Sequence, residues 1–215
     1  MTRTWSPDAA DPSLTAIART PRLLVALDFD GTVSEFAVEP MSARVLPEAK
    51  DAVDRLTALP DTVVAYVSGR SLDHLRVIAE HDDDSTIALA GSHGAQHWIP
   101  GEGRIDPADT PGERVLRERL WDEVGELLRA YPGVELERKT YGLGIHGRPA
   151  DPAVEERAFA AVDALMERGA PGWRRRTGDR ILEFSSRPEG KDAAIAALRE
   201  RYAATGVLFA GDDVT

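Results

Sequence analysis

The 215-residue sequence contains no cysteine, which excludes disulfide bonds and cysteine-ligated metal sites. It also lacks a basic excess, since 26 Lys and Arg residues against 37 Asp and Glu residues give a formal net charge of −11. Proteins that bind nucleic acid non-specifically need a basic surface, so we expect no nucleic-acid partner. An anionic small molecule is still a suitable ligand, because a few local cations dominate at short range.

Long hydrophobic runs are absent as well. No stretch approaches the roughly 18 apolar residues that cross a bilayer, so we expect no membrane association. Residues 1–20 include Asp8 and Asp11 and do not have the apolar core of a signal peptide. We expect a loose arm there and a cytoplasmic location. Hydrophobic residues nevertheless make up 42% of the chain, which is enough for a folded core.

Short apolar runs alternate with helical patterns in the first half of the chain. Continuous apolar runs are typical of strands that are buried on both faces of a parallel sheet. A further helix and run follow near the end of the sequence. The pattern predicts an α/β fold with a doubly wound, mainly parallel sheet. The predicted strands are 23–27, 62–67, 86–90 and 206–210, and the predicted helices are 47–59, 72–79 and 191–201.

The middle of the chain has a different pattern. Residues 100–112 are rich in Gly, Pro and Asp, which indicates a linker. The segments that follow alternate apolar and polar residues, as half-exposed strands do, and they are mixed with amphipathic helices. We therefore expect a smaller α+β unit inserted into the larger one. The expected divisions are an arm at 1–20, a core at 21–106 and 188–215, and an inserted cap at 107–187.

Acidic residues follow the first and the last predicted strands of the core. Asp28 and Asp30 come directly after the first strand, and Asp212 and Asp213 after the last. The carboxyl ends of parallel strands share one edge of a sheet, so these side chains are expected to meet there. Such a cluster is costly unless a hard cation such as Mg²⁺ compensates it. The alternative is that Asp-Gly marks a turn and the last pair caps a helix.

Two further residues favour an anion near these carboxylates. Ser68 follows the second strand, where its hydroxyl and the first amides of a helix are suited to bind a phosphate. Lys191 precedes the last strand and could hold the same anion. The alternatives are a simple helix cap and a solvated surface lysine. Together, the carboxylates, the hydroxyl and the lysine predict a phosphoryl-transfer site.

Segments 28–32, 68–70 and 211–213, with Lys191, resemble the four motifs of the haloacid dehalogenase-like phosphatases, in the same order. The resemblance implies the Rossmann-like core of that superfamily with an inserted cap. It also implies that Asp28 is a nucleophile forming an aspartyl-phosphate and that Asp30 is the general acid and base.

The same resemblance implies the ligands of the site. Mg²⁺ would be bound by Asp28, by Asp30 through its backbone carbonyl, and by Asp212. The phosphoryl group would be held by Ser68, Gly69 and Lys191, while Asp213 would orient ligands or pair with Lys191.

A narrower resemblance covers the chain from about residue 22 to residue 215. Segments 91–95, 137–139, 146–148, 182–184 and 211–215 are similar to the trehalose-phosphate phosphatase family. This implies trehalose 6-phosphate as the small-molecule substrate, in the last step of trehalose biosynthesis. The residues implied to bind the substrate are Arg70, His93, Glu137, Lys139, His146, Arg148 and Glu183.

Strand geometry supports part of this set. Spacing by two residues places Glu137 with Lys139 on one face of a strand, and His146 with Arg148 likewise. The alternative for the first pair is a solvated strand face. The run Arg174 to Arg176 is interpreted as surface charge, because no family motif covers it.

The sequence departs from the family pattern at three places. Gln96 replaces a usual Glu, which predicts a weaker sugar contact, and Gly147 replaces a usual aromatic residue in the cap. The sequence stops at Thr215, where the family motif continues, and we expect a truncated C-terminus. A phosphatase for a sucrose- or mannosylglycerate-type phosphate and a non-catalytic regulatory domain remain alternatives. The sequence predicts no oligomeric state.

Overall fold

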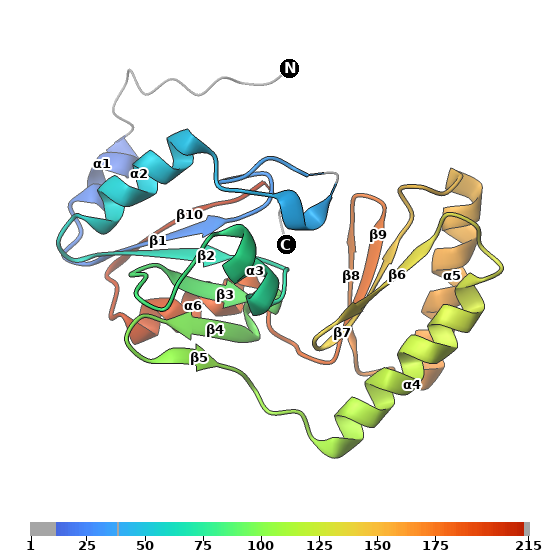
Figure 1. The fold of residues 1–215 in the computed structure, drawn as a ribbon. Coiled ribbons are helices and arrows are strands. Elements are labelled where there is room, and N and C mark those ends of the chain that lie inside the picture. The colour runs from blue at the N-terminus through green and yellow to red at the C-terminus, as the bar shows by residue number, and fades with distance from the viewer. Residues whose placement is uncertain (1–11, 38, 213–215) are drawn as a thin grey trace. The chain divides into compact units, whose positions relative to one another are not determined.

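The computed structural model of the chain describes residues 12–37 and 39–212. The chain divides into two compact units, the first of residues 1–106 with 189–215 and the second of residues 107–188 (Figure 1). Two assignments differ from the expected boundaries: the segment 1–20, expected as a separate arm, is grouped with the first unit, and Pro188 belongs to the second unit. No helix among the described residues has the length and apolar character needed to cross a membrane.

A six-stranded sheet forms the centre of the first unit. Its strands β10, β1, β2 and β3 are parallel, whereas β4 and β5 are antiparallel additions at one edge. In spatial order the strands are β10 (Gly206–Ala210), β1 (Leu23–Asp28), β2 (Thr62–Val67), β3 (Ala88–Gly91), β4 (Gln96–Ile99) and β5 (Gly103–Ile105). The parallel part confirms the predicted sheet. The predicted linker over 100–112 is wrong where it contains β5.

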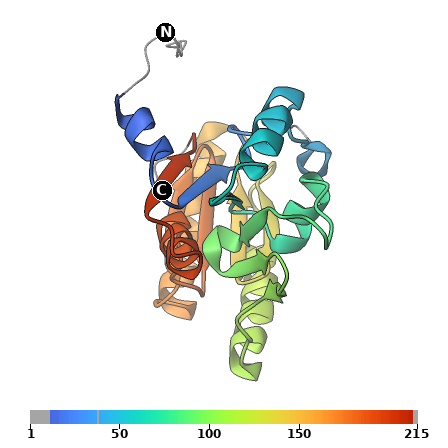
Figure 2. The same ribbon diagram turned by 90° about the vertical axis from the view of Figure 1, so that its left-hand side faces the viewer.

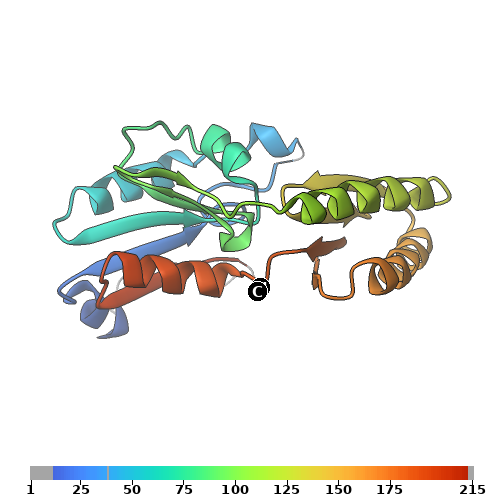
Figure 3. The same cartoon turned by 90° about the horizontal axis from the view of Figure 1, so that it is seen from below.

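Both faces of this sheet are covered by helices. The helices α2 (Pro47–Thr57) and α3 (Leu72–Ile78) pack on one face and α6 (Lys191–Arg201) packs on the other (Figure 3). Successive residues of β1 point to opposite faces, so Val25 packs in the core with α2 and α3, whereas Leu24 and Ala26 pack in the core with α6. This two-sided burial explains why β1 is a continuous apolar run.

Short helices complete the first unit. Residues 12–18 were expected in a loose arm, but they form α1 (Pro12–Ala18), which lies beside β10 (Figure 2). Proline at its first position and alanines near its end favour this helix. Two 3₁₀ turns, η1 (Pro40–Ser42) and η2 (Ser92–Gly94), follow β1 and β3.

The second unit is an antiparallel sheet with two helices on one face (Figure 1). In spatial order its strands are β6 (Glu135–Lys139), β7 (Gly142–His146), β9 (Ile181–Ser185) and β8 (Arg174–Gly178). The helices are α4 (Pro111–Leu128) and α5 (Pro152–Gly169). Helix α4 starts within the segment predicted as a linker, because Thr110 and Glu113 form a capping box around Pro111.

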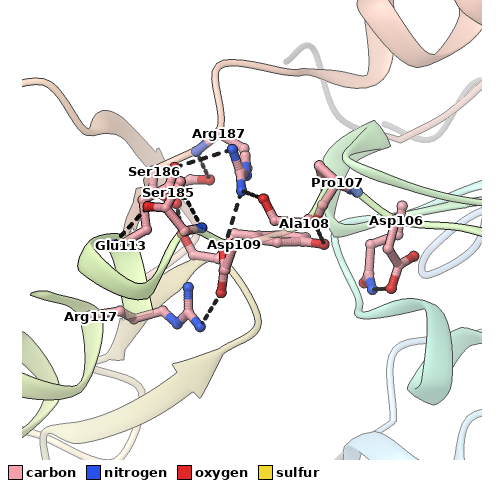
Figure 4. Close-up of polar contacts among 12 residues, drawn as sticks. Asp106, Pro107, Ala108, Asp109, Glu113, Arg117, Ser185, Ser186 and Arg187 are labelled. Atoms are coloured by element: carbon pink, nitrogen blue, oxygen red, sulfur yellow. Dashed lines mark hydrogen bonds and ion pairs between the residues drawn. The ribbon is translucent and has the colours of Figure 1, made fainter. Parts of the chain in front are cut away.

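The segments that enter and leave the second unit are held together by Arg187 (Figure 4). Its guanidinium donates to the carbonyl oxygen of Ala108 (3.3 Å) and to Oδ1 of Asp109 (3.2 Å). Arg117 donates to the other carboxylate oxygen of Asp109 at 2.5 Å. Burial favours a higher pKa for Asp109, but Arg117 and Arg187 outweigh it and lower the pKa. The two connecting segments are therefore joined by charge-assisted hydrogen bonds.

Candidate active site

The end of β1 carries a buried ion pair. Asp28 is the last residue of the strand and Lys191 the first residue of α6, and the two residues are only 3% and 4% exposed. The lysine Nζ lies 2.5 Å from Oδ2 of Asp28, and the backbone amide of Phe29 donates to Oδ1 at 2.8 Å. The sheet and α6 thus place a carboxylate and an ammonium group at one point, as the sequence predicts.

Arg70 and Asp30 form a second pair beside the first. The guanidinium donates from Nε to Oδ2 of Asp30 (2.7 Å) and from Nη2 to Oδ1 (2.6 Å). Its Nη1 also donates to the carbonyl oxygen of Pro40 at 2.8 Å. A bidentate pair fixes the orientation of both side chains. Arg70, which the family resemblance assigns to the substrate, is thus held by Asp30 in this structure.

Asp212, which follows β10, lies at the same edge, beside the turn after β1. Gly31 has a φ of +76°, and a Cβ placed on it would lie 2.6 Å from Oδ2 of Asp212. The positive φ favours glycine here, and the lack of a Cβ leaves room for the carboxylate of Asp212. Because Leu27 pairs with Ala210 in neighbouring parallel strands, the residues that follow them, including Asp28, lie at the same end of the sheet. Asp213, also expected here, lies outside the described residues.

The oxygen donors at this edge suit magnesium. Among residues 12–37 and 39–212, no three acidic or histidine side chains gather to hold a metal ion. Magnesium usually takes only one or two carboxylates and completes its shell with water and substrate oxygens. Asp28 and Asp212, with the backbone carbonyl of Asp30, could supply such a set without a third side chain. The carboxylate of Asp30 is instead engaged by Arg70.

Ser68 directly follows β2 and is almost fully buried. Its amide donates to the carbonyl oxygen of Ala90 (2.8 Å), and its Oγ accepts from the amide of Arg70 (3.2 Å). The expectation that Ser68 starts a helix is wrong, since Ser71 caps α3 by accepting from the amide of His74. Four residues of loop, 68–71, separate the strand from the helix, and the hydroxyl of Ser68 organises that loop.

Gly69 and His93 are in close contact. A Cβ on Gly69 would lie 2.7 Å from Cε1 of His93, so glycine is needed for the imidazole to approach this loop. The amide of His93 donates to the carbonyl oxygen of Ser68 at 2.9 Å, and His93 has a φ of +58°. The structure therefore brings His93 to the phosphate-binding loop that the sequence predicts.

Gln96 does not have the sugar-facing position that the sequence suggested. Its side chain is fully buried, and Oε1 accepts from the amide of Leu72 (3.0 Å) and from Oγ of Ser92 (2.8 Å). Its Nε2 donates to Oδ2 of Asp106 at 3.0 Å. An ionised Glu has no such donor, so the amide here joins β4 to the end of the first segment of the core.

The face of the second sheet that α4 and α5 leave uncovered carries a polar cluster, defined by Glu137, Lys139, His146 and Glu183. Lys139 pairs closely with Glu183 and lies 3.5 Å from Glu137. His146 Nε2 lies 2.9 Å from Oε2 of Glu137. Gly144 pairs in register with both glutamates, so no side chain separates them. The strand alternation predicted the shared face of Glu137 and Lys139.

The charges in the polar cluster support one another. Burial favours a lower pKa for Lys139, but Glu183 and Glu137 outweigh it and raise the pKa above its ordinary value. Burial likewise favours a higher pKa for Glu137, but His146 and Lys139 outweigh it and lower the pKa. The cluster therefore presents charged donors and acceptors together, which suits a ligand rich in hydroxyl groups.

Arg148 does not join the polar cluster. Strand β7 ends at His146, so the alternation that predicted a shared face does not extend to Arg148, which pairs instead with Asp179 at 3.3 Å. Beside it, a Cβ on Gly147 would lie 2.5 Å from the side chain of Glu155. Glu155 thus occupies the space next to the glycine that replaces an aromatic residue.

Strand β8 adds a residue that the sequence reasoning missed. Arg176 pairs in register with Glu183, which places it on the face of the polar cluster, whereas Arg175 binds Asp163 of α5. The alternation within the arginine run was the available signal. An all-polar segment has no hydrophobic period, so the sequence does not identify these residues as a strand.

A protein-family model matches most of this chain. The trehalose-phosphatase family model matches residues 26–215. A Sinorhizobium fredii protein named probable trehalose-phosphate phosphatase is 29% identical over 195 residues, which cover 88% of this chain and 69% of that protein. A protein of Oryza sativa subsp. japonica, named probable trehalose-phosphate phosphatase 9, is 32% identical over 215 residues, which cover 93% of this chain and 54% of that protein.

A solved structure shares the fold. The C-terminal domain of C. albicans trehalose-6-phosphate phosphatase superposes with a TM-score of 0.79 and 19% identity, covering 93% of this chain and 72% of that one. The chain thus spans only part of the length of each protein compared.

Proposed function

Because this chain belongs to the trehalose-phosphatase family, we propose that it hydrolyses trehalose 6-phosphate to trehalose and inorganic phosphate, the last step of trehalose biosynthesis. The observation that carries the proposal is the buried Asp28 held by Lys191 at the carboxyl edge of the parallel sheet. A carboxylate fixed in this way is oriented for attack, and the ammonium group beside it is suited to bind a phosphoryl oxygen.

The proposed reaction has two halves. In the first, a carboxylate oxygen of Asp28 bonds to phosphorus and the bond from phosphorus to the sugar oxygen breaks, while Asp30 gives a proton to that oxygen. In the second, Asp30 takes a proton from water, whose oxygen bonds to phosphorus and displaces the carboxylate of Asp28. Phosphate leaves and both aspartates return to their starting states.

Arg70 positions the carboxylate of Asp30, the proposed acid and base. Its two hydrogen bonds, of 2.7 and 2.6 Å, fix the carboxylate plane of Asp30 next to the nucleophile. Ser68 and Gly69 form the loop that would donate to the phosphoryl oxygens together with Lys191.

We propose Mg²⁺ as the cofactor, held by Asp28, Asp212 and the backbone carbonyl of Asp30. When bound, it would neutralise charge on the phosphoryl oxygens. The oxygen-only donor set supports magnesium over a softer metal.

Selection of the disaccharide is assigned to the polar cluster. The carboxylates of Glu137 and Glu183 can accept hydrogen bonds from sugar hydroxyls, and Lys139 can donate to them. The mutual support of these charges lowers the pKa of Glu137 and raises the pKa of Lys139, so these two groups stay charged without substrate.

The test is phosphate release from a panel of substrates with Mg²⁺ and with Mg²⁺ removed by EDTA. We expect trehalose 6-phosphate to be preferred over sucrose, glucose and mannosylglycerate phosphates, and EDTA to abolish the reaction. Equal rates across the panel would contradict the assignment of trehalose 6-phosphate as substrate but would still support the phosphatase reaction. No release from any of them would favour a non-catalytic binding domain.

A further inference from the structure

The polar cluster belongs to a longer row of residues that crosses the whole second sheet, called here the cross-strand row. Strand β8 forms one edge of this sheet, next to β9 (Figure 1). Neighbouring strands lie about 4.8 Å apart, so a row over four strands is about 14 Å wide. In spatial order, the register aligns Glu137 of β6, Gly144 of β7, Glu183 of β9 and Arg176 of β8.

The three arginines of β8 have different surroundings. Arg175 lies on the helical side of the sheet, where it binds Asp163 of α5 at 2.7 Å. Arg174 donates from Nη1 to the carbonyl oxygen of Pro188 at 2.6 Å, which fixes the end of the second unit. Arg176 is half-buried, although both of its neighbours along the strand are exposed. The register and the burial together make Arg176 the cation at the outer end of the cross-strand row.

The guanidinium of Arg176 changes what this face can bind. The rest of the row presents the carboxylates of Glu137 and Glu183, both of which Lys139 contacts. Arginine is not deprotonated in proteins, and it carries five N–H donors in a fixed fork. The fork can give two parallel hydrogen bonds to neighbouring oxygen atoms. Arg176 can therefore bind two adjacent hydroxyl groups of a sugar while it also contacts the protein.

We propose that Arg176 determines the preference for a disaccharide phosphate over a monosaccharide phosphate, an inference that rests on the proposed phosphatase function. A single sugar ring covers only part of a row about 14 Å wide, whereas two joined rings reach from the glutamates to its outer end. The ring at the glutamates is present in both kinds of substrate. The ring at Arg176 is present only in the disaccharide, so this contact separates the two.

The test compares three substrates with the whole chain and Mg²⁺: trehalose 6-phosphate, glucose 6-phosphate and p-nitrophenyl phosphate. Steady-state kinetics give kcat and KM for the wild type and for Arg176→Met. We expect the substitution to lower kcat/KM for trehalose 6-phosphate about 10- to 100-fold, mainly through a higher KM, because hydrogen bonds from a charged donor are lost. The values for the other two substrates should change by less than about twofold.

Two further variants identify the cause. Arg176→Lys keeps the positive charge without the fork, so it should restore only part of the selectivity. Arg175→Met makes the same substitution at the neighbouring residue, whose partner Asp163 lies on the other side of the sheet, and serves as the control with unchanged selectivity. Circular dichroism and urea unfolding establish that each variant is folded.

A binding measurement tests the same contact without the reaction. Trehalose and glucose are each titrated into the whole chain without Mg²⁺, and the affinities are measured by NMR. We expect the wild type to bind trehalose more tightly than glucose. Arg176→Met should bind the two sugars about equally, because it lacks the group that contacts the second ring.

The outcomes separate this inference from the proposed function. A wild type that releases no phosphate from trehalose 6-phosphate would contradict the proposed function, and the sugar titrations would still test Arg176. Unchanged selectivity and unchanged trehalose binding in Arg176→Met would overturn the inference alone. An equal loss with all three substrates would also overturn it, since that pattern shows a role in folding or in the chemical step. So would a wild type that binds trehalose no better than glucose.

Discussion

Lys191 lies directly against Asp28, with Nζ 2.5 Å from the carboxylate oxygen, although the two residues are 163 positions apart in the sequence. Both side chains are buried. Removing two charges from water costs free energy that an apolar pair packed at the same place would not cost. The pair therefore indicates that this edge of the sheet is arranged for chemistry. It also provides the most direct set of predictions.

Lys191→Met should strongly impair catalysis. Loss of a preorganised cation beside the phosphoryl group is expected to lower kcat about 10²- to 10³-fold. Removal of one partner of a buried ion pair should also lower the free energy of unfolding by about 3–5 kcal/mol. Phosphate release and urea unfolding measure the two effects. Arg55→Met, which removes an exposed cation from α2, should change neither; near-normal turnover of Lys191→Met would reject the assigned role.

Arg70→Lys separates two roles for this arginine. If Arg70 positions Asp30, lysine cannot reproduce the bidentate contact, and kcat should fall about tenfold while KM changes by less than about twofold. Steady-state kinetics with trehalose 6-phosphate measure both constants. A higher KM with unchanged kcat would instead show that Arg70 binds the substrate, as the family resemblance implies.

Lys139→Met tests the polar cluster. The substitution leaves Glu137 and Glu183 without the cation between them and removes a donor for the sugar. We expect kcat/KM for trehalose 6-phosphate to fall about 10- to 100-fold. Hydrolysis of p-nitrophenyl phosphate, which has no sugar, should be nearly unchanged. An equal loss for the two substrates would mean that Lys139 acts on the chemical step or on folding.

The contacts of Asp109 predict a dependence of stability on pH. Asp109→Asn should lower the free energy of unfolding by about 1–3 kcal/mol at neutral pH, because it removes the carboxylate shared by Arg117 and Arg187. The folded pKa of Asp109 lies below its ordinary value of 3.8. Its contribution is therefore complete above pH 3.8 and is lost as the pH falls through the folded pKa.

Urea unfolding at pH 7 and at about pH 3 measures this difference. The gap between wild type and Asp109→Asn should narrow at the lower pH. Asp179→Asn, at a site where the side chain is 82% exposed, is the matched control and should show no such gap. A gap of the same size at the two pH values would mean that Asp109 acts through packing rather than through its charge.

Much of the fold follows from local patterns. The strand β1 is visible in the sequence because it is a continuous apolar run, and α5 because its apolar residues recur at helical spacing. The strands β5 and β8 are not visible, since their residues are largely polar and their existence depends on pairing with β4 and β9. Such pairing is a non-local property that periodicity does not encode.

The site was predictable to a similar extent. The positions of Asp28 and Lys191 follow from one rule, the convergence of loops at the carboxyl edge of a parallel sheet. The partners of individual side chains do not follow. Arg70 binds Asp30 across 40 residues, and Gln96 accepts from Leu72 across 24, and both contacts depend on how loops pack.

The central claim is that Asp28 is the nucleophile of a trehalose 6-phosphate phosphatase. The most direct measurement is the rate of phosphate release from trehalose 6-phosphate by Asp28→Asn, beside wild type and the exposed control Asp51→Asn. Asparagine keeps the size of the side chain and removes its nucleophilic oxygen, so we predict a loss of at least about 10³-fold, with the control unchanged. Release by Asp28→Asn at a rate near that of wild type would contradict the account.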